Sequence, residues 1–190
     1  MKEQIARTIA LHKEMLANIE ETGIEVIAKC AQIIIDSINA GGTVYICGNG
    51  GSAADAQHIA GEFIGRFLRE RRALPAVALS TDTSVITAIG NDYSFDDIFV
   101  RQVEALLKPA DCLWAISTSG NSANVVAAAK LAKKRNAKII AFTGRAESKL
   151  EKLADACLCA HAEKSFATQE MHQLAYHIIC DLVEQAFAKG

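Results

Sequence analysis

The sequence has none of the features that mark a membrane protein, a secreted protein or a general nucleic-acid binder. No apolar run approaches the roughly 18 residues that a transmembrane helix needs. The N-terminus is polar and leads into an amphipathic pattern, not into the apolar stretch of a signal peptide. A net charge of −2 and an isoelectric point near 6.2 give no basic excess for nucleic acid. We therefore expect a cytoplasmic protein without a membrane or nucleic-acid partner.

Paired-cysteine motifs are also missing, because no two cysteines form a CxxC pattern. Most of the six cysteines sit inside apolar stretches. They are Cys30, Cys47, Cys112, Cys157, Cys159 and Cys180. A chain of this size and helical character does not need disulfides, so the pattern predicts buried free thiols and argues against a zinc–thiolate site.

No linker, internal repeat or low-complexity tract divides the chain, and it has only two prolines. With 190 residues, of which 51% are apolar, it is long enough for a real core. We expect one domain over residues 1–190.

From residue 43 onward, short apolar stretches alternate with helix-favouring ones. Strands are predicted at about 43–47, 76–79, 112–116, 138–142 and 156–160. Helices are predicted at about 53–68, 122–135 and 168–188, with a short one from Ser148. This order predicts an α/β fold with a doubly wound, flavodoxin-like, five-stranded parallel sheet and helices on both faces.

Two amphipathic helices, at about 3–22 and 24–40, precede the first strand. Two helices are more than a small sheet needs for cover. The segment 1–40 is therefore expected either to pack against another subunit or to cover one face of the sheet.

A glycine-rich turn, CGNGGS at 47–52, follows the first strand and precedes an alanine-rich helix. Free backbone N–H groups and the helix dipole favour an anion at such a place, and Ser52 stands where an N-cap is expected. The alternative is an ordinary tight turn. On the helix, His58 and Glu62 share a face, with Asp55 on the same side. This pair suits a divalent metal or proton transfer, or else simply supports the helix surface.

Arg66 lies four residues after Glu62, so it is expected either to pair with Glu62 or to reach an anionic ligand. The segment 90–93, Gly-Asn-Asp-Tyr, is explained by turn chemistry. The functional alternative there is that Asn91 and Asp92 contact a hydroxylated ligand.

A second polar motif, STSGNS at 117–122, follows the predicted third strand. Its hydroxyl groups, its glycine and the helix that follows can together wrap a phosphate. The last helix carries Gln169, Glu170 and His177. Helical periodicity alone does not decide whether Gln169 or Glu170 shares a site with His177.

Four segments together resemble the phosphoheptose isomerases of the sugar-isomerase (SIS) domain superfamily. They are CGNGGSAADAQHIAGEF at 47–63, AIGNDYSFDDIF at 88–99, ISTSGNSANV at 116–125 and QEMHQLAYH at 169–177. The resemblance spans about residues 24–187. It implies isomerisation of sedoheptulose 7-phosphate to D-glycero-D-manno-heptose 7-phosphate, the first step of bacterial heptose biosynthesis for lipopolysaccharide or capsule. It also implies a homotetramer with active sites between subunits, in which the N-terminal helices form a helical core.

The resemblance further implies one Zn²⁺ per subunit and a set of site residues. The implied metal ligands are His58, Glu62, Gln169 and His177. The implied substrate contacts are Asn49, Gly50, Gly51, Ser52, Glu62, Arg66, Asn91, Asp92, Ser117, Thr118, Ser119, Ser122 and Gln169. Glu62 would be the base at carbon and His177 the opposite acid/base of an enediol mechanism.

Two places depart from the family pattern. Ala167-Thr168 stand where an Arg-Ile is usual, and Arg145-Ala146-Glu147 stand where many members have a glycine run. A related sugar phosphate is therefore kept as an alternative substrate. Two other functions are weighed: a non-catalytic scaffold for a replication initiator protein, whose relatives lack the acidic residue at position 62, and a sugar-phosphate-sensing module.

Overall fold

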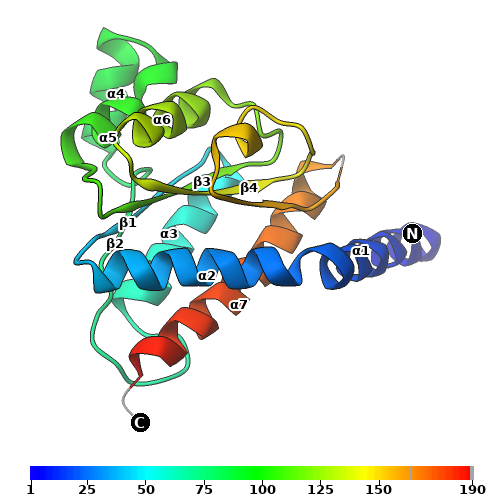
Figure 1. Ribbon diagram of the computed structural model, residues 1–190. Helices are drawn as coiled ribbons and strands as arrows, with labels where there is room; N and C mark the ends of the chain where they lie inside the picture. Colours follow the sequence, from blue (N-terminus) through cyan, green and yellow to red (C-terminus); the bar gives the residue numbers. More distant parts are fainter. Residues whose placement is uncertain (163, 189–190) are drawn as a thin grey trace.

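Five parallel strands form the centre of the computed structural model, which describes residues 1–162 and 164–188 (Figure 1). They are β1 (Val44–Cys47), β2 (Ala76–Ala78), β3 (Cys112–Ser117), β4 (Lys138–Thr143) and β5 (Ala156–Cys159). Their order is β2-β1-β3-β4-β5, and every neighbouring pair is parallel. The central strand β3 is buried along its whole length, as expected for a strand covered on both faces. The predicted doubly wound, flavodoxin-like sheet is confirmed.

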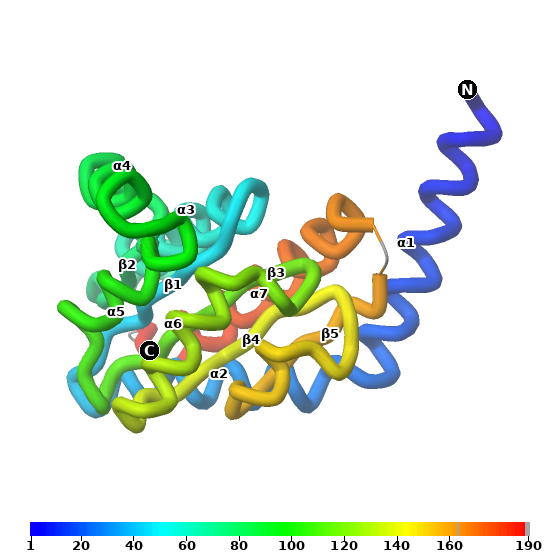
Figure 2. The backbone as a smooth tube through the Cα atoms, turned by 90° about the horizontal axis from the view of Figure 1, so that it is seen from above, coloured from blue at the N-terminus to red at the C-terminus, as the bar shows by residue number. Residues whose placement is uncertain are grey.

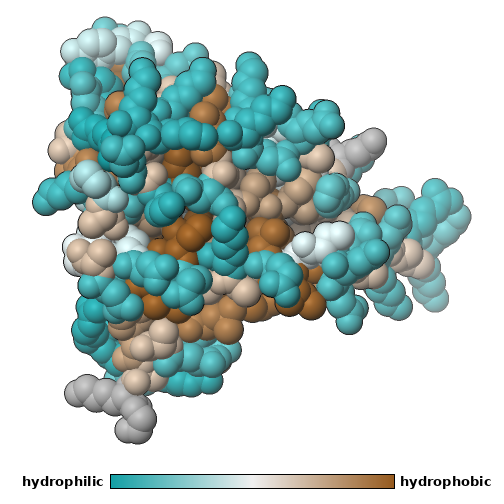
Figure 3. Space-filling model, viewed as in Figure 1, coloured by the Kyte–Doolittle hydropathy of each residue, from teal (hydrophilic) through white to brown (hydrophobic). Residues whose placement is uncertain are grey.

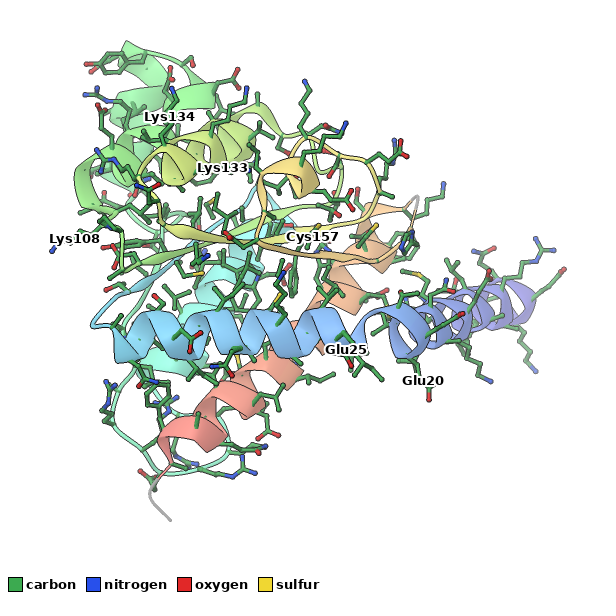
Figure 4. The ribbon with its side chains drawn as sticks, in the orientation of Figure 1. Glu20, Glu25, Lys108, Lys133, Lys134 and Cys157 are labelled. Carbon is green, nitrogen blue, oxygen red and sulfur yellow. The ribbon has the colours of Figure 1, made fainter. Side chains whose placement is uncertain are left out.

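Helices cover both faces of this sheet and enclose two separate apolar clusters (Figure 1). One face carries α2 (Ile24–Asn39), α3 (Gly51–Ile64) and α7 (Ser165–Phe187). The other carries α4 (Thr83–Asp92), α5 (Val100–Leu106) and α6 (Ala123–Lys134). Lys133 and Lys134 lie in the last turn of α6, where positive charge complements the helix dipole (Figure 4). Two single-turn 3₁₀ helices, η1 (Phe95–Asp97) and η2 (Glu151–Leu153), complete the set.

The sheet has its switch point between β1 and β3. The chain leaves β1 through α3 on one face and leaves β3 through α6 on the other. The loops at the carboxyl ends of these two neighbouring strands therefore diverge and leave a crevice, the usual ligand site of such sheets. Both polar motifs, 47–52 and 117–122, lie at this place.

The two N-terminal helices differ in position. α2 lies along the sheet, while α1 (Lys2–Thr22) projects from the body (Figure 2). Met15 and Ile19 attach α1 to the core. Residues 1–40 were expected either to cover the sheet or to contact another subunit. α2 covers the sheet, but this does not explain the projecting part of α1.

Several predicted boundaries were wrong. Residues 90–92 form the last turn of helix α4 and not a free turn, because Asp82 caps the helix by accepting a hydrogen bond of 2.9 Å from the Val85 backbone N–H. No α-helix begins at Ser148, whose hydroxyl instead accepts from the Glu151 N–H ahead of η2. The helix predicted at 53–68 begins at Gly51 and ends at Ile64.

All six cysteines are free, as predicted. Four are buried, and Cys157 and Cys159 on β5 are partly buried (Figure 4 labels Cys157). Within residues 1–162 and 164–188, no helix is both long enough and apolar enough to cross a membrane.

Candidate active site

The turn between β1 and α3 places backbone amides and two glycines against helix α7. Gly50 precedes the helix with φ of 56°, a conformation that glycine adopts at little cost. A Cβ atom on Gly51 would lie 2.3 Å from the Nε2 atom of Gln169. Gln169 thus packs directly on the turn, and a side chain at position 51 would displace its amide. Ser52 is not the N-cap: it lies in the first helical turn with its side chain buried.

Asn49 and Asn124 join the two motif loops. Each side-chain amide donates to the other's oxygen, and both distances are 2.9 Å. The Asn124 oxygen also accepts from the Val125 N–H at the start of α6. This reciprocal pair fixes the turn after β1 relative to the loop after β3.

Two helices bring three potential ligands together. His58 and Glu62 come from α3 and His177 from α7, and one ligand atom of each lies within 4.8 Å of the others. The Nε2 atom of His58 is 3.1 Å from Glu62 Oε1, with side-chain exposures of 43% and 21%. The pair is therefore not isolated on the helix surface, because a third titratable group from another helix joins it. Two imidazoles and a carboxylate form a donor set that suits Zn²⁺.

Tyr176 on α7 contacts His58 of this cluster, and the sequence analysis did not single it out. It is fully buried, and its hydroxyl lies 2.9 Å from the Nδ1 atom of His58. At an apolar position of α7 it is indistinguishable from a core aromatic, although a buried tyrosine hydroxyl generally requires a partner. On the other side, Phe67 stacks on His177 with 5.5 Å between ring centroids.

Burial sets the protonation of the groups around the cluster. It raises the pKa of Asp55 to about 6, against the opposing effect of His58, and one carboxyl oxygen of Asp55 is buried without a hydrogen-bond partner. Burial and the neighbouring His58 lower the pKa of His177, with Glu62 opposing. His177 is therefore a neutral imidazole at neutral pH.

The hydroxyl loop, residues 117–122, turns several side-chain oxygens toward one another. Ser117 Oγ lies 2.9 Å from Ser122 Oγ and 3.3 Å from Ser119 Oγ. Gly120 takes φ of 65° at the bend. A cavity of about 110 Å³ opens beside the loop, and it is lined by Thr118, Ser119, Arg145, Ala162, Ser165 and Thr168. Arg145 thus adds a cation that the sequence analysis noted only as a family departure.

The structure also separates residues that the sequence had grouped. Glu170 pairs with His12 of α1, whereas the Gln169 amide lies against Gly51 in the turn after β1. Arg66 does not pair with Glu62; it lies beyond the end of α3 and pairs with Glu70 at 3.3 Å.

Near the end of α4, the side-chain amide of Asn91 donates a hydrogen bond of 2.8 Å to the Asp92 carboxylate. Within the part of the chain that the structure describes, neither forms a hydrogen bond to the hydroxyl loop or to the His58 cluster.

A buried carboxylate holds the segment after α3 in place. Glu184 on α7 accepts hydrogen bonds from the N–H groups of Phe67, Leu68 and Arg69 at 2.8, 2.6 and 2.7 Å. Its partner Arg71, 3.4 Å away, donates in turn to the Glu62 carbonyl at 2.6 Å. This network connects the position of Phe67, and hence its stacking on His177, to the backbone of Glu62.

Comparison with known proteins agrees with this geometry. The family model for the SIS domain matches residues 9–144. The chain is 46% identical over 184 residues to the phosphoheptose isomerase of Aliarcobacter butzleri, which covers 97% of both chains. It is 53% identical over 161 residues to that of Methylibium petroleiphilum, covering 83% of this chain and 80% of the relative.

The chain belongs to the phosphoheptose isomerase family of SIS domain proteins. The solved structure of phosphoheptose isomerase GmhA from Neisseria gonorrhoeae matches it with a TM-score of 0.90 at 40% identity, covering 97% of this chain and 98% of that one. As a member of the phosphoheptose isomerase family, the chain is an enzyme of the sugar-phosphate isomerase class. The scaffold and sensor alternatives are set aside.

Proposed function

We propose that the protein interconverts sedoheptulose 7-phosphate and D-glycero-D-manno-heptose 7-phosphate, as the first step of bacterial heptose biosynthesis. The observation that carries the proposal is the meeting of His58, Glu62 and His177 between α3, the helix that begins at the glycine-rich turn, and α7, whose Gln169 packs on that turn. A carboxylate and a neutral imidazole are the pair that an aldose–ketose isomerisation needs. The names of the relatives support the seven-carbon substrate.

The phosphate end of the substrate is proposed to bind at the hydroxyl loop. Ser117, Thr118, Ser119 and Ser122 supply hydroxyl donors there, and α6 begins directly after the loop. Arg145 lines the adjoining cavity and adds the positive charge that a phosphate dianion favours. Anchoring this end orients the sugar toward the His58 cluster. The further sugar contacts proposed are Asn49, Gly50, Gly51, Ser52, Glu62, Arg66, Asn91, Asp92 and Gln169.

The proton transfers are assigned to Glu62 and His177. Glu62 removes a proton from C1 of the ketose and returns it to C2, so that one carboxylate serves both carbons of a cis-enediol. His177 donates its N–H proton to the oxygen on C2 and recovers a proton from the oxygen on C1. Its lowered pKa suits this role, because a neutral imidazole can donate its N–H proton to one oxygen and return from imidazolate to the neutral form by taking the proton of the other.

The donor set also fits a zinc ion. His58, Glu62 and His177 would hold it, with Gln169 as the fourth ligand proposed. A bound Zn²⁺ would polarise the substrate carbonyl and stabilise the enediolate oxygen. A glutamate bound to a cation is a weaker base, so we assign the ligand and base roles of Glu62 to different states of the site.

The homotetramer is proposed on the hydrophobic surface of the N-terminal helices. Ile5, Ile9 and Leu16 on α1 are about half exposed, and Ile24 at the start of α2 is more so. Figure 3 shows hydrophobic surface on both sides of α2. Contiguous apolar surface of this kind is typical of an interface between subunits. Residues 1–40 of the single SIS domain would form it.

The test is a proton NMR time course with sedoheptulose 7-phosphate in D₂O. New aldose anomeric signals, with deuterium entering C2, are the expected result. The Glu62→Gln variant should lose at least about a hundredfold in rate, as expected for loss of a general base. Glu104→Gln, which alters an exposed pair with Arg101 away from the proposed site, is the matched control and should retain activity. No product and no exchange, even with added zinc, would overturn the heptose assignment.

A further inference from the structure

Tyr176 makes a contact that the proposed reaction does not use. Its hydroxyl is 2.9 Å from His58 Nδ1, and the two rings meet edge to face with 5.5 Å between centroids. The other ring nitrogen of His58, Nε2, is 3.1 Å from Glu62 Oε1. Each nitrogen of His58 therefore has one partner, and the partners differ in what they can do. A carboxylate oxygen only accepts, whereas a tyrosine hydroxyl can donate or accept.

This asymmetry decides the tautomer of a neutral His58. Because Glu62 accepts, Nε2 must carry the hydrogen, and Nδ1 must then accept from Tyr176. A tyrosine hydroxyl is protonated at neutral pH, so the Tyr176 hydroxyl, 2.9 Å from Nδ1, has a hydrogen to donate. Both ring nitrogens of His58 then have a hydrogen-bond partner while the imidazole is neutral.

We propose that Tyr176 is a positioning residue that supports the His58 tautomer required by Glu62, by donating to Nδ1, and that its hydroxyl reverses direction when His58 becomes a metal ligand. A cation held at Nε2 requires the hydrogen on Nδ1, which then donates to the Tyr176 oxygen. This second half of the proposal rests on the proposed metal site, and the first half does not. An aliphatic or phenylalanine side chain at position 176 would leave Nδ1 without this partner in either arrangement.

The reversal needs a new acceptor for the tyrosine proton, and the structure contains one. The Oδ2 atom of Asp55 is buried and has no hydrogen-bond partner. Asp55 is near enough to act electrostatically on both Tyr176 and His58. A buried carboxyl oxygen without a donor is costly unless a donor can turn toward it. Asp55 is thus the group that accepts the Tyr176 proton in the second arrangement.

The experiment compares Tyr176→Phe with the wild type by multiple-bond ¹H–¹⁵N NMR of histidine-labelled protein at about pH 8. His58→Asn serves only to assign the His58 signals. Chelator-treated wild type should show His58 protonated on Nε2 alone. Tyr176→Phe keeps Glu62 and should keep this tautomer, but its Nδ1 resonance should shift because the donor is lost. Glu62→Gln, whose amide can also donate, should show a mixture of both tautomers. Tyr93→Phe, which changes an exposed tyrosine, is the control and should match the wild type.

Zinc titration with a competing chelator tests the second half. The wild type should convert to the Nδ1–H form on binding zinc, and Tyr176→Phe should bind zinc roughly 10- to 100-fold more weakly, the usual effect of removing a partner of a metal-bound histidine. Unchanged affinity in Tyr176→Phe would overturn the reversal. A wild type protonated on Nδ1 without zinc would overturn the tautomer assignment, even if Tyr176→Phe failed to fold. A wild type that binds no zinc would overturn the proposed metal site and leave the tautomer result standing.

Discussion

At the scale of single residues, His172 and His177 show that two identical side chains on one helix can have different environments and different roles. His177 is partly exposed in the cluster with His58 and Glu62, whereas His172 is completely buried. The Nε2 atom of His172 lies 3.1 Å from the Thr143 carbonyl, while its Nδ1 atom has no partner. Burial lowers the pKa of His172 to about 4, so it is a neutral structural residue.

This buried histidine predicts a pH dependence of stability. Its folded pKa of about 4 lies below the ordinary value of 6.5. Between these values the unfolded chain binds a proton that the folded chain does not. The free energy of unfolding should therefore fall as the pH falls from 6.5 to 4, by up to about 1.4 kcal/mol per pH unit. Urea unfolding of the wild type and His172→Gln across this range measures it; the variant should show the flatter dependence, and parallel curves would contradict the assignment.

Arg145 carries a prediction about substrate affinity. Removing its charge in Arg145→Ala should raise KM about fivefold with little change in kcat, since an exposed charge-assisted contact to phosphate contributes roughly 1 kcal/mol. The difference should shrink at high salt because exposed charges are screened. Arg145→Lys should recover part of the loss. Lys149→Ala, a nearby exposed cation, is the control, and an equal KM effect there would refute a specific role for Arg145.

The residues of the site could be predicted only in part. The spacing of His58 and Glu62 predicts a shared helix face, which the structure confirms. Their distance to His177 depends on how two helices pack, and local sequence does not contain that information; the family resemblance supplied it. Tyr176 was missed because a tyrosine at an apolar helix position has the same pattern as any core residue. The catalytic and binding roles remain predictions.

At the scale of elements, the connection after α3 depends on α7. Glu184 and Arg71 are both about 1% exposed, and they replace the secondary structure that residues 65–72 lack. Burial alone would favour a protonated Glu184, but three backbone N–H donors and Arg71 outweigh it and lower its pKa. The carboxylate thus contributes stability at neutral pH, and this contribution is lost as the pH falls through its lowered pKa.

Glu184→Gln is expected to lower the free energy of unfolding by about 3 kcal/mol, because it leaves the buried Arg71 without its counter-ion. Asp181→Asn removes the exposed partner of Arg69 on the same helix and should change it by less than about 1 kcal/mol. Chemical unfolding at one protein concentration compares the two variants. Equal losses would show that Glu184 is not a structural anchor.

Helices and strands with strong apolar patterns were predicted well. Helices whose start depends on a capping residue were predicted poorly. The strands are short, apolar and buried, so their periodicity was unambiguous. Helix α4 was missed because its sequence mixes β-branched residues with Gly90, which weakens helix propensity. The signal that could have found it is Asp82, the N-cap residue.

At the scale of the whole molecule, α1 is the element least explained by the isolated chain. It projects from the body and leaves Ile9 52% exposed (Figure 2). If this surface is a subunit contact, Ile9→Glu should convert a four-chain particle into smaller species, because a charge is buried without a partner. Size-exclusion chromatography with light scattering measures the mass. Glu14→Lys on the exposed side of α1 is the control, and a monomeric wild type would refute the proposed tetramer.

The order of strands and helices in the sheet could be predicted from the sequence, whereas the projection of α1 from the body of the molecule could not. Alternation of strands and helices determines a right-handed parallel sheet with few possible orders. An amphipathic helix can bury its apolar side on its own chain or on another, and the sequence pattern is the same in both cases.

The amide pair between Asn49 and Asn124 has a consequence for how the enzyme becomes active during its own synthesis. The two residues are 75 positions apart in the chain. A nascent chain that contains only β1 and α3 has the glycine-rich turn but not the loop after β3 that opposes it. The chain between Asn49 and Asn124 must lose conformational entropy before their hydrogen bonds can form. The two motif loops are therefore aligned only after β3 has joined β1, and the His58 cluster is completed later still, when α7 brings in His177.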